Sequence, residues 1–136
     1  MKIDLEMVAS AMDSRDEIVW YVDRKTGEVL MSYDVDEPEV VELNKQIEND
    51  PDRFLVIEPI DSRDGYLVME DFVDTLPEGE ARRSLFRAIN GPKPFASFKH
   101  VLHDFPDERK AWFEFEHERS LESAREFLRA NGIEFE

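Results

Sequence analysis

The hydrophobic pattern of the sequence changes near residue 60, and this change limits the fold more than any other feature. Before it, apolar runs of strand length alternate with short helical patterns, whereas after it apolar residues recur at helical spacing. The 136 residues amount to about one domain's length, and neither part alone carries a large core. We therefore predict a single domain, 1–136, with an α/β lobe at 1–60 and a helical lobe at 61–136.

Two short helices are expected within the first sixty residues. Asp4 is suited to cap a helix over 4–12, because its carboxylate can accept a hydrogen bond from a free backbone amide of the first turn. A second helix is expected from Pro38 to Asn49. Proline is suited to the first turn, because a backbone N–H at that position would have no partner within the helix.

Three strands are expected around these helices. Residues 17–22 and 28–33 are rich in β-branched and aromatic side chains and flank a turn. In that turn Asp23 can bond backbone amides and Gly27 can take a positive φ, so a hairpin is predicted. The unbroken apolar run at 53–57 indicates a third strand that is central or covered on both faces.

About four helices are expected after residue 60. Ser62 is a candidate cap for the first, the second ends at Asn90, the third begins at Pro94, and the last begins at Pro106. The last helix is expected to bury a stripe formed by Phe113, His117, Leu121, Ala124 and Leu128. The sequence thus predicts an α+β fold, in which α-β-β-α-β with a small, mainly antiparallel three-stranded sheet precedes a group of helices.

The composition argues against several classes of protein. There are 33 acidic and 17 basic residues, and a net charge of -16 opposes attraction to nucleic acid or to an anionic membrane. The absence of cysteine excludes disulfides and thiolate metal sites. No run approaches the roughly 20 apolar residues that span a bilayer. We expect a cytoplasmic protein without a membrane segment or cofactor, and the oligomeric state stays open.

Charge is unevenly distributed along the chain. Residues 82–110 hold seven basic and three acidic residues, so this window is positive within an acidic protein. One interpretation is a binding surface for an acidic protein partner or, less favoured, for RNA or a phosphate; the other is that these cations neutralise the protein's own acids or solvate helix faces. The candidate binding residues are Arg82, Arg83, Arg87, Lys93 and Lys99.

A few residues have the spacing of metal sites. His100 and His103 are three residues apart on an expected helix, and Glu114 and His117 have the Glu-x-x-His spacing of carboxylate-bridged di-iron proteins. These four residues define an alternative, a metal-dependent enzyme. The structural alternative is two surface histidines and one core histidine. The remaining candidate cation ligands are the carboxylates Asp34, Asp36, Glu37 and Glu39.

The stock of catalytic groups is otherwise thin. The sequence contains no phosphate loop, dinucleotide-binding turn, His-Glu-x-x-His pair or nucleophile elbow. We therefore favour a non-enzymatic binding or regulatory domain. A further alternative is an acidic mimic of nucleic acid, because residues 1–61 carry 17 acidic and 6 basic residues. The aromatic residues at 95–115 favour core packing over base stacking, and they are Phe95, Phe98, Phe105, Trp112, Phe113 and Phe115.

Two stretches of the chain carry a family resemblance. They are the hairpin Tyr21-Val22-Asp23-Arg24-Lys25-Thr26-Gly27-Glu28-Val29 and the stretch Phe95-Ala96-Ser97-Phe98-Lys99-His100-Val101-Leu102, the latter followed by Trp112-Phe113 and Glu118-Arg119. Through them the chain resembles uncharacterised protein family 0158 over nearly its whole length. The resemblance implies a small bacterial cytoplasmic protein and supplies no catalytic residue.

Overall fold

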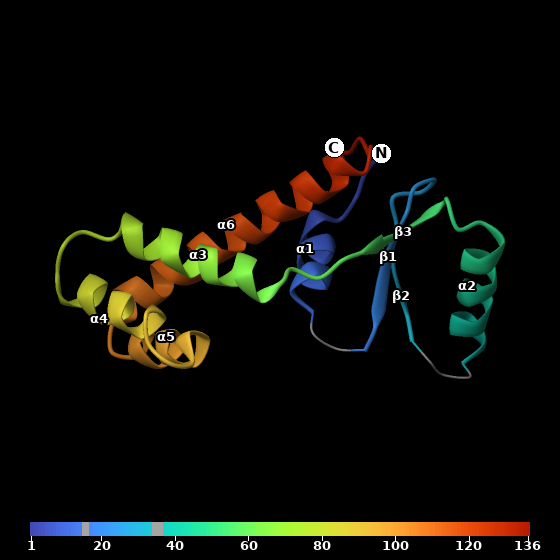
Figure 1. Cartoon of the computed structure of the whole chain (residues 1–136). Coiled ribbons are helices and arrows are strands. Elements are labelled where there is room, and N and C mark those ends of the chain that lie inside the picture. Colours follow the sequence, from blue (N-terminus) through green and yellow to red (C-terminus); the bar gives the residue numbers. More distant parts are fainter. Residues whose placement is uncertain (15–16, 34–36) are drawn as a thin grey trace. The chain divides into compact units, whose positions relative to one another are not determined.

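The fold is described from a computed structural model, which covers residues 1–14, 17–33 and 37–136 (Figure 1). Its contacts divide the chain into two units. Unit 1 is formed by Met1–Pro59 and Ser120–Glu136, and unit 2 is formed by Ile60–Arg119. The boundary falls where the hydrophobic pattern changes, but the last residues, which the sequence placed with the helical lobe, group with unit 1. That the chain is a single domain stays a prediction.

Unit 1 contains a three-stranded antiparallel sheet in the order β2-β1-β3. Tyr21 of the central strand lies opposite Leu30 on one side and Val56 on the other. The expectation that the third strand is central or doubly covered is wrong, since β3 is an edge strand and Val56 is 43% exposed. The strand bounds are β1 (Val19–Asp23), β2 (Val29–Ser32) and β3 (Phe54–Ile57).

The hairpin between β1 and β2 is confirmed, together with its local cause. Gly27 has a φ of 79°, and its N–H donates to the Asp23 carbonyl at 2.7 Å. One carboxylate oxygen of Asp23 accepts a hydrogen bond from the Lys25 N–H at 2.9 Å. The turn is therefore closed by the aspartate and glycine chemistry that the sequence indicates.

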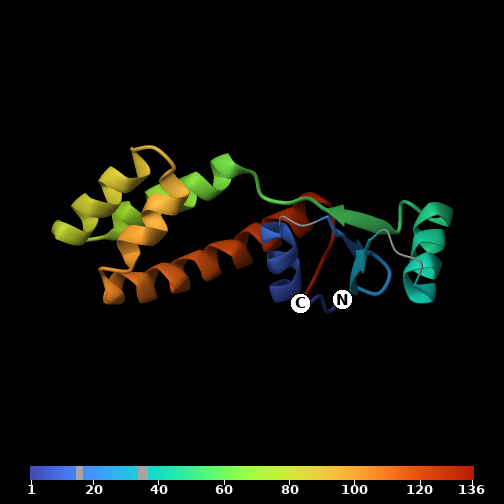
Figure 2. The ribbon, with the colours of Figure 1, turned by 90° about the horizontal axis from the view of Figure 1, so that it is seen from below.

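Two helices of unit 1 lie on opposite sides of this sheet (Figures 1 and 2). They are α1 (Leu5–Asp13), next to β3, and α2 (Pro38–Asn49), next to β2. The Asp4 cap of α1 is confirmed, because its carboxylate accepts from the Met7 N–H at 3.2 Å. A hydrogen bond between the Ser32 hydroxyl and the Asn44 side chain joins α2 to the sheet.

The C-terminal segment completes the core of unit 1. It contributes Ala124 and Leu128, which are fully buried, and Ile133, which is 6% exposed. The Arg24 guanidinium donates to the Asn131 carbonyl at 2.8 Å, so the hairpin is tied to the same segment. Buried apolar side chains from the rest of unit 1 are Ile3, Val8, Ala9, Ala11, Met12, Val22, Val40, Phe54 and Ile57.

Unit 2 is helical. Its elements are α3 (Ser62–Thr75), α4 (Glu80–Ile89), α5 (Pro94–Leu102) and the first part of α6 (Pro106–Ala130). The cap of α3 is Asp61 rather than the expected Ser62, since the Asp64 N–H donates to the Asp61 carboxylate at 2.9 Å. Ser62 is already the first helical residue, and the preceding residue is the one whose side chain reaches the free amides.

An aromatic cluster forms the core of unit 2. The ring centroids of Phe72 and Trp112 are 5.3 Å apart and those of Phe98 and Trp112 are 4.8 Å apart, in edge-to-face arrangements. The Tyr66 hydroxyl donates to the Ile89 carbonyl at 3.0 Å, which ties α3 to the end of α4. The other buried members are Met69, Val73, Leu85, Ile89 and Leu102.

The two parts of α6 bury different faces of the helix. Near its start, Trp112 is 7% exposed, whereas Phe113 is 51% exposed and His117 is exposed as well. The expected stripe is therefore wrong in its first half and confirmed only at Ala124 and Leu128, with Leu121 half-buried. A single periodicity fails here because each part of the helix belongs to a different unit.

Candidate functional site

The candidate surface is the outer side of the α4–α5 hairpin in unit 2. Helix α4 is amphipathic and buries Leu85, Ala88 and Ile89, while α5 buries Phe98 and Leu102. Apolar residues at these spacings occupy the inner face of each helix, which leaves charged side chains on the outer face. The two helices lie side by side (Figure 2).

The five candidate cations all belong to this hairpin. Arg83, Arg87, Lys93 and Lys99 are exposed and Arg82 is half-buried. No acidic residue occurs anywhere from Ala81 to His103. Within the described part of the chain, none of the five forms an ion pair. We call Arg82, Arg83, Arg87, Lys93 and Lys99 the α4–α5 cationic surface.

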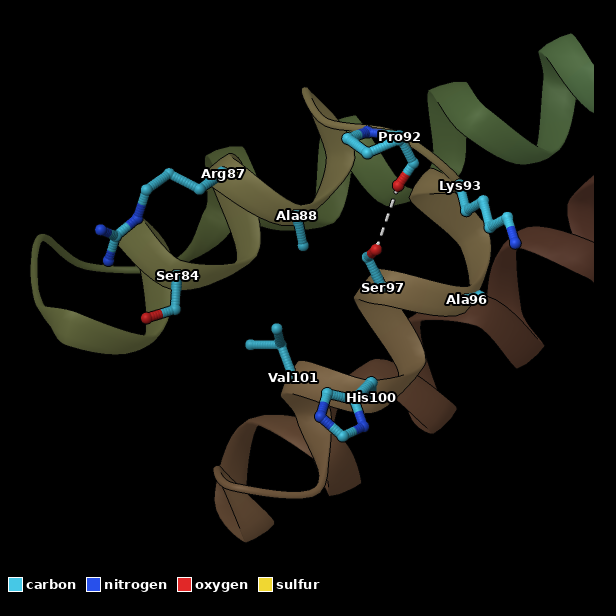
Figure 3. Close-up of a pocket in the computed structure, with 9 residues that line it drawn as sticks. All are labelled: Ser84, Arg87, Ala88, Pro92, Lys93, Ala96, Ser97, His100 and Val101. Atoms are coloured by element: carbon cyan, nitrogen blue, oxygen red, sulfur yellow. Dashed lines mark hydrogen bonds between the residues drawn. The ribbon is translucent and has the colours of Figure 1, made fainter.

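Arg87 and Lys93 line a hollow of about 800 Å³ between α4 and α5. Figure 3 shows the two cations at opposite ends of this hollow, with Ala88 and Val101 directed into it. The Ser97 hydroxyl donates to the Pro92 carbonyl at 3.2 Å. The remaining lining residues are Ser84, Ala96 and His100. The hollow thus combines an apolar floor with a cationic rim.

The other candidate cations do not converge on this hollow. Arg82 and Arg83 line a separate one of about 290 Å³, together with Glu78, Gly79 and Phe86. Lys99 lines neither hollow.

Sequence analysis missed Phe86, which is 57% exposed beside these arginines. Its position between Leu85 and Arg87, off the apolar stripe of α4, is the signal that indicates an outward-facing phenylalanine.

The backbone at Lys93 is unusual. Its φ of 51° and ψ of 59° place a lysine in the left-handed region, where residues other than glycine are strained by about 1 kcal/mol or more. Its carbonyl accepts from the Ser97 N–H at 3.0 Å, so this strained residue, which directly precedes α5, accepts the first hydrogen bond of that helix.

The aromatic residues of unit 2 are divided between core and surface. Phe98 and Trp112 belong to the core, as the sequence favours. Phe95 is 40% exposed and Phe113 is 51% exposed, so these two do not follow that expectation. The Arg109 guanidinium lies 5.0 Å from the Phe113 ring centroid, in a cation–π contact that covers part of the exposed ring.

The histidines and glutamates that the sequence suggested as metal ligands do not form a cluster in the described part of the chain. His100 and His103 are exposed on and after α5, and Glu114 and His117 are exposed on α6. His117 is thus not the core histidine that the sequence favours. Among the described residues, no three histidine or acidic side chains gather closely enough to hold a metal ion. Of the acidic run proposed as cation ligands, Glu37 and Glu39 are exposed, and Asp34 and Asp36 lie outside the described residues.

The buried ionisable side chain of the described chain is Asp23 in unit 1, which is 2% exposed. Arg53 binds both of its carboxylate oxygens, at 2.9 and 2.7 Å. This hydrogen-bonded partner lowers the pKa of Asp23 from 3.8 to about 2, although burial opposes the shift, and it raises the pKa of Arg53. Sequence analysis assigned Asp23 to the turn and missed Arg53, since the two are thirty positions apart. The pair joins the hairpin to β3.

Comparisons with known proteins place the chain in a family. The model of the uncharacterised protein family UPF0158 matches residues 1–136. The UPF0158 protein PA5073 of Pseudomonas aeruginosa is 34% identical over 135 residues, which cover 98% of this chain and 86% of that protein. UPF0158 proteins of Chlamydia muridarum and Chlamydia trachomatis are 26% and 24% identical over 96% of this chain, which spans 40% of their length.

No solved structure matches the chain. Within the described residues, none of the helices combines the length and apolar character needed to cross a membrane. The match of the family model over the whole sequence, together with the relative from Pseudomonas aeruginosa, establishes the assignment. This chain belongs to the uncharacterised protein family UPF0158.

Proposed function

We propose that this chain is a non-enzymatic binding module whose α4–α5 cationic surface docks an acidic segment of a partner protein. One observation carries the proposal: five cations lie on a hairpin that contains no acidic residue from Ala81 to His103, and none of them forms an ion pair within the described chain. A protein with 33 acidic residues has abundant internal partners for such cations. That the described acidic residues leave these cations unpaired supports an external partner over internal neutralisation.

The lining of the larger hollow favours a peptide segment over a nucleic acid backbone. Ala88 and Val101 give it an apolar floor that can accept an aliphatic side chain, while Arg87 and Lys93 stand at its ends to receive carboxylates. Its lining residues include no phenylalanine, tyrosine or tryptophan, and His100 supplies the one aromatic ring, whereas single-stranded nucleic acids bind largely through successive bases stacked on several such rings. An acidic amphipathic helix presents both features that this hollow can receive.

Two alternative functions that the sequence suggests are not supported by any contact among the described residues. A metal-dependent enzyme using Glu114, His117, His100 and His103 needs these side chains to converge, and they are exposed without forming a cluster of three ligands in the described residues. An acidic mimic of nucleic acid rests on the negative charge of residues 1–61 alone.

The proposal is tested with a defined probe, a fluorescein-labelled helical peptide of about 14 residues in which leucine and glutamate alternate at helical spacing. Fluorescence anisotropy measures its dissociation constant for the wild type, for R83E/R87E and for a control, R63E. Arg63 is an exposed arginine on α3, outside the cationic surface. We expect R83E/R87E to weaken binding by about tenfold or more, R63E to bind within about twofold of the wild type, and added salt to weaken binding.

Other outcomes contradict the proposal. Equal binding to R83E/R87E and to the wild type places the peptide elsewhere. If a peptide of the same composition but scrambled spacing binds as tightly as the helical peptide, the apolar floor of the hollow does not contribute to recognition. Tighter binding of a single-stranded RNA of about 12 nucleotides than of the peptide identifies nucleic acid as the partner class instead. Circular dichroism melts of each variant verify that the fold is retained.

A further inference from the structure

We infer that helix α2 of a second copy of this chain occupies the α4–α5 hollow, so that self-association competes with the binding of other acidic segments. The inference rests on the proposed function and names one occupant of the same hollow. It arises from two complementary surfaces, one in each unit, and both are present in every copy of the chain.

Helix α2 presents a largely uncovered face. Of its residues only Val40 is buried, while Leu43 and Ile47 are half-buried against unit 1. Val41 lies outside this inner face and is 37% exposed. Val41 follows the buried Val40, and the 100° step between helical residues turns it away from the inner face. An aliphatic side chain is therefore available on the outer face.

The surroundings of this exposed valine are acidic. Residues 37–52 contain six acidic residues and one basic residue, whereas residues 81–103 contain five basic residues and no acidic one. The Tyr33 hydroxyl donates to a carboxylate oxygen of Glu37 at 3.3 Å, and the charge of that carboxylate raises the pKa of Tyr33. The six acids, all exposed, are Glu37, Glu39, Glu42, Glu48, Asp50 and Asp52.

The two surfaces match in chemistry. Val41 fits the apolar floor made by Ala88 and Val101, which contains no large side chain to displace. On α2, Glu42 lies about 100° around the helix from Val41, whereas Glu48 lies two turns further on nearly the same face, with Lys45 between Val41 and Glu48. A helix laid into the hollow on Val41 thus brings Glu42 to one edge and Glu48 along the groove. Arg87 and Lys93 stand at opposite ends of that rim (Figure 3). The arrangement is a helix-in-groove contact with one apolar anchor and charged edges.

The net charge of -16 does not prevent such a contact. The Debye length is about 10 Å in 0.1 M salt, so charges distant from the contact are largely screened while the opposite charges at the hollow still attract. Because each copy carries both surfaces, the contact can join one copy to another in a dimer. In that dimer the hollow is filled, and an acidic partner has to displace α2 to reach it.

The experiment reverses the charge of each surface in turn. Sedimentation velocity in about 0.1 M salt compares the wild type, R87E/K93E and E42K/E48K, each alone, with an equimolar mixture of the two variants. We expect a dimer in the wild type, monomers for each variant alone, and dimers again in the mixture, where one native and one reversed contact are both attractive. R63E alone is the control and is expected to form the dimer as the wild type does, because its reversed charge lies outside both surfaces.

The results separate this inference from the proposed function. A wild type that stays monomeric up to about 0.5 mM, or a mixture that stays monomeric, overturns the inference. If the helical peptide still binds and still depends on Arg83 and Arg87, the proposed function stands without it. If the wild type and the mixture both form dimers but peptide binding does not depend on Arg83 and Arg87, the α2 contact is supported. The proposed docking of other acidic segments is then contradicted.

Discussion

Replacing Asp23 by asparagine tests the role of the ion pair that joins the hairpin to β3. In D23N a neutral amide, with one acceptor oxygen and one donor NH2 group, replaces the two carboxylate oxygens that the Arg53 guanidinium binds at 2.9 and 2.7 Å, and the Lys25 N–H loses a charged acceptor. Because Asp23 is 2% exposed, water does not readily replace these contacts.

The expected magnitude follows from the pKa of Asp23. A shift from 3.8 to about 2 corresponds to about 2.5 kcal/mol of stability at neutral pH. The folded-state pKa is the lower one, so this contribution is complete above the unfolded value of 3.8 and is lost as the pH falls toward 2. The difference in the free energy of unfolding between the wild type and D23N is therefore about 2.5 kcal/mol at pH 7 and shrinks between about pH 4 and pH 2.

The two tryptophans allow each unit to be followed separately, since Trp20 belongs to unit 1 and Trp112 to unit 2. In a W112F background, urea unfolding monitored by the fluorescence of Trp20 reports on unit 1. With a urea dependence of about 1.5 kcal/mol per M, D23N is expected to lower the midpoint by about 1.7 M at pH 7. The matched control is D52N, which makes the same charge change at an exposed aspartate of unit 1 and is expected to leave the midpoint nearly unchanged.

Two results would refute this reasoning. A D23N midpoint within about 0.3 M of the wild type at pH 7 shows that the pair contributes little beyond what water supplies. A difference that stays constant down to pH 2.5 shows that lost packing, and not the charge of Asp23, accounts for the effect.

Two further predictions concern a glycine and an aromatic residue, each with a matched control. G27A is expected to lower the stability of unit 1 by more than G132A, although both glycines have a positive φ. A Cβ at Gly27 would lie 2.5 Å from a backbone oxygen, whereas none of the described atoms would lie within 4 Å of a Cβ at Gly132. Urea midpoints from the fluorescence of Trp20 measure the difference. F98A is expected to destabilise unit 2 by about 3–5 kcal/mol and F113A by less than about 1 kcal/mol, since Phe98 is 1% exposed and Phe113 is 51% exposed. Thermal melts measure both losses, and equal losses would contradict the assignment of Phe98 to the core.

Local signals in the sequence were sufficient for much of the fold. The hairpin turn depends on Asp23 and Gly27, which act within a few residues of each other, and the Asp4 cap acts within one helical turn. Such features need no knowledge of distant contacts, and the structure confirms them. The order α-β-β-α-β followed by helices is confirmed for the same reason.

Features set by tertiary contacts could not be predicted in the same way. The run at 53–57 is apolar throughout, yet β3 lies at an edge because β1 pairs with both other strands. His117 occupies the expected stripe of α6 but is exposed, because the face of α6 that unit 2 buries is the one that carries Trp112. The hydrophobic spacing within one helix does not reveal that the helix packs against unit 2 in its first part and against unit 1 in its last part.

The candidate site lies between these cases. The excess of cations at 82–110 was visible in the sequence, and so were the five residues that form the α4–α5 cationic surface. That Arg87 and Lys93 share one hollow while Arg82 and Arg83 share another depends on how α4 packs against α5, which no spacing rule supplies.

The discontinuous course of unit 1 has a consequence for the order of events during synthesis. Unit 2, Ile60–Arg119, is continuous in the chain and is complete before Ser120–Glu136 has been translated. Residues 1–59 leave the ribosome before unit 2, yet their core lacks the buried side chains of Ala124, Leu128 and Ile133 until that later segment has followed. During synthesis, unit 2 is thus expected to fold before unit 1 is complete, and the sheet of unit 1 stays accessible to chaperones and proteases until then.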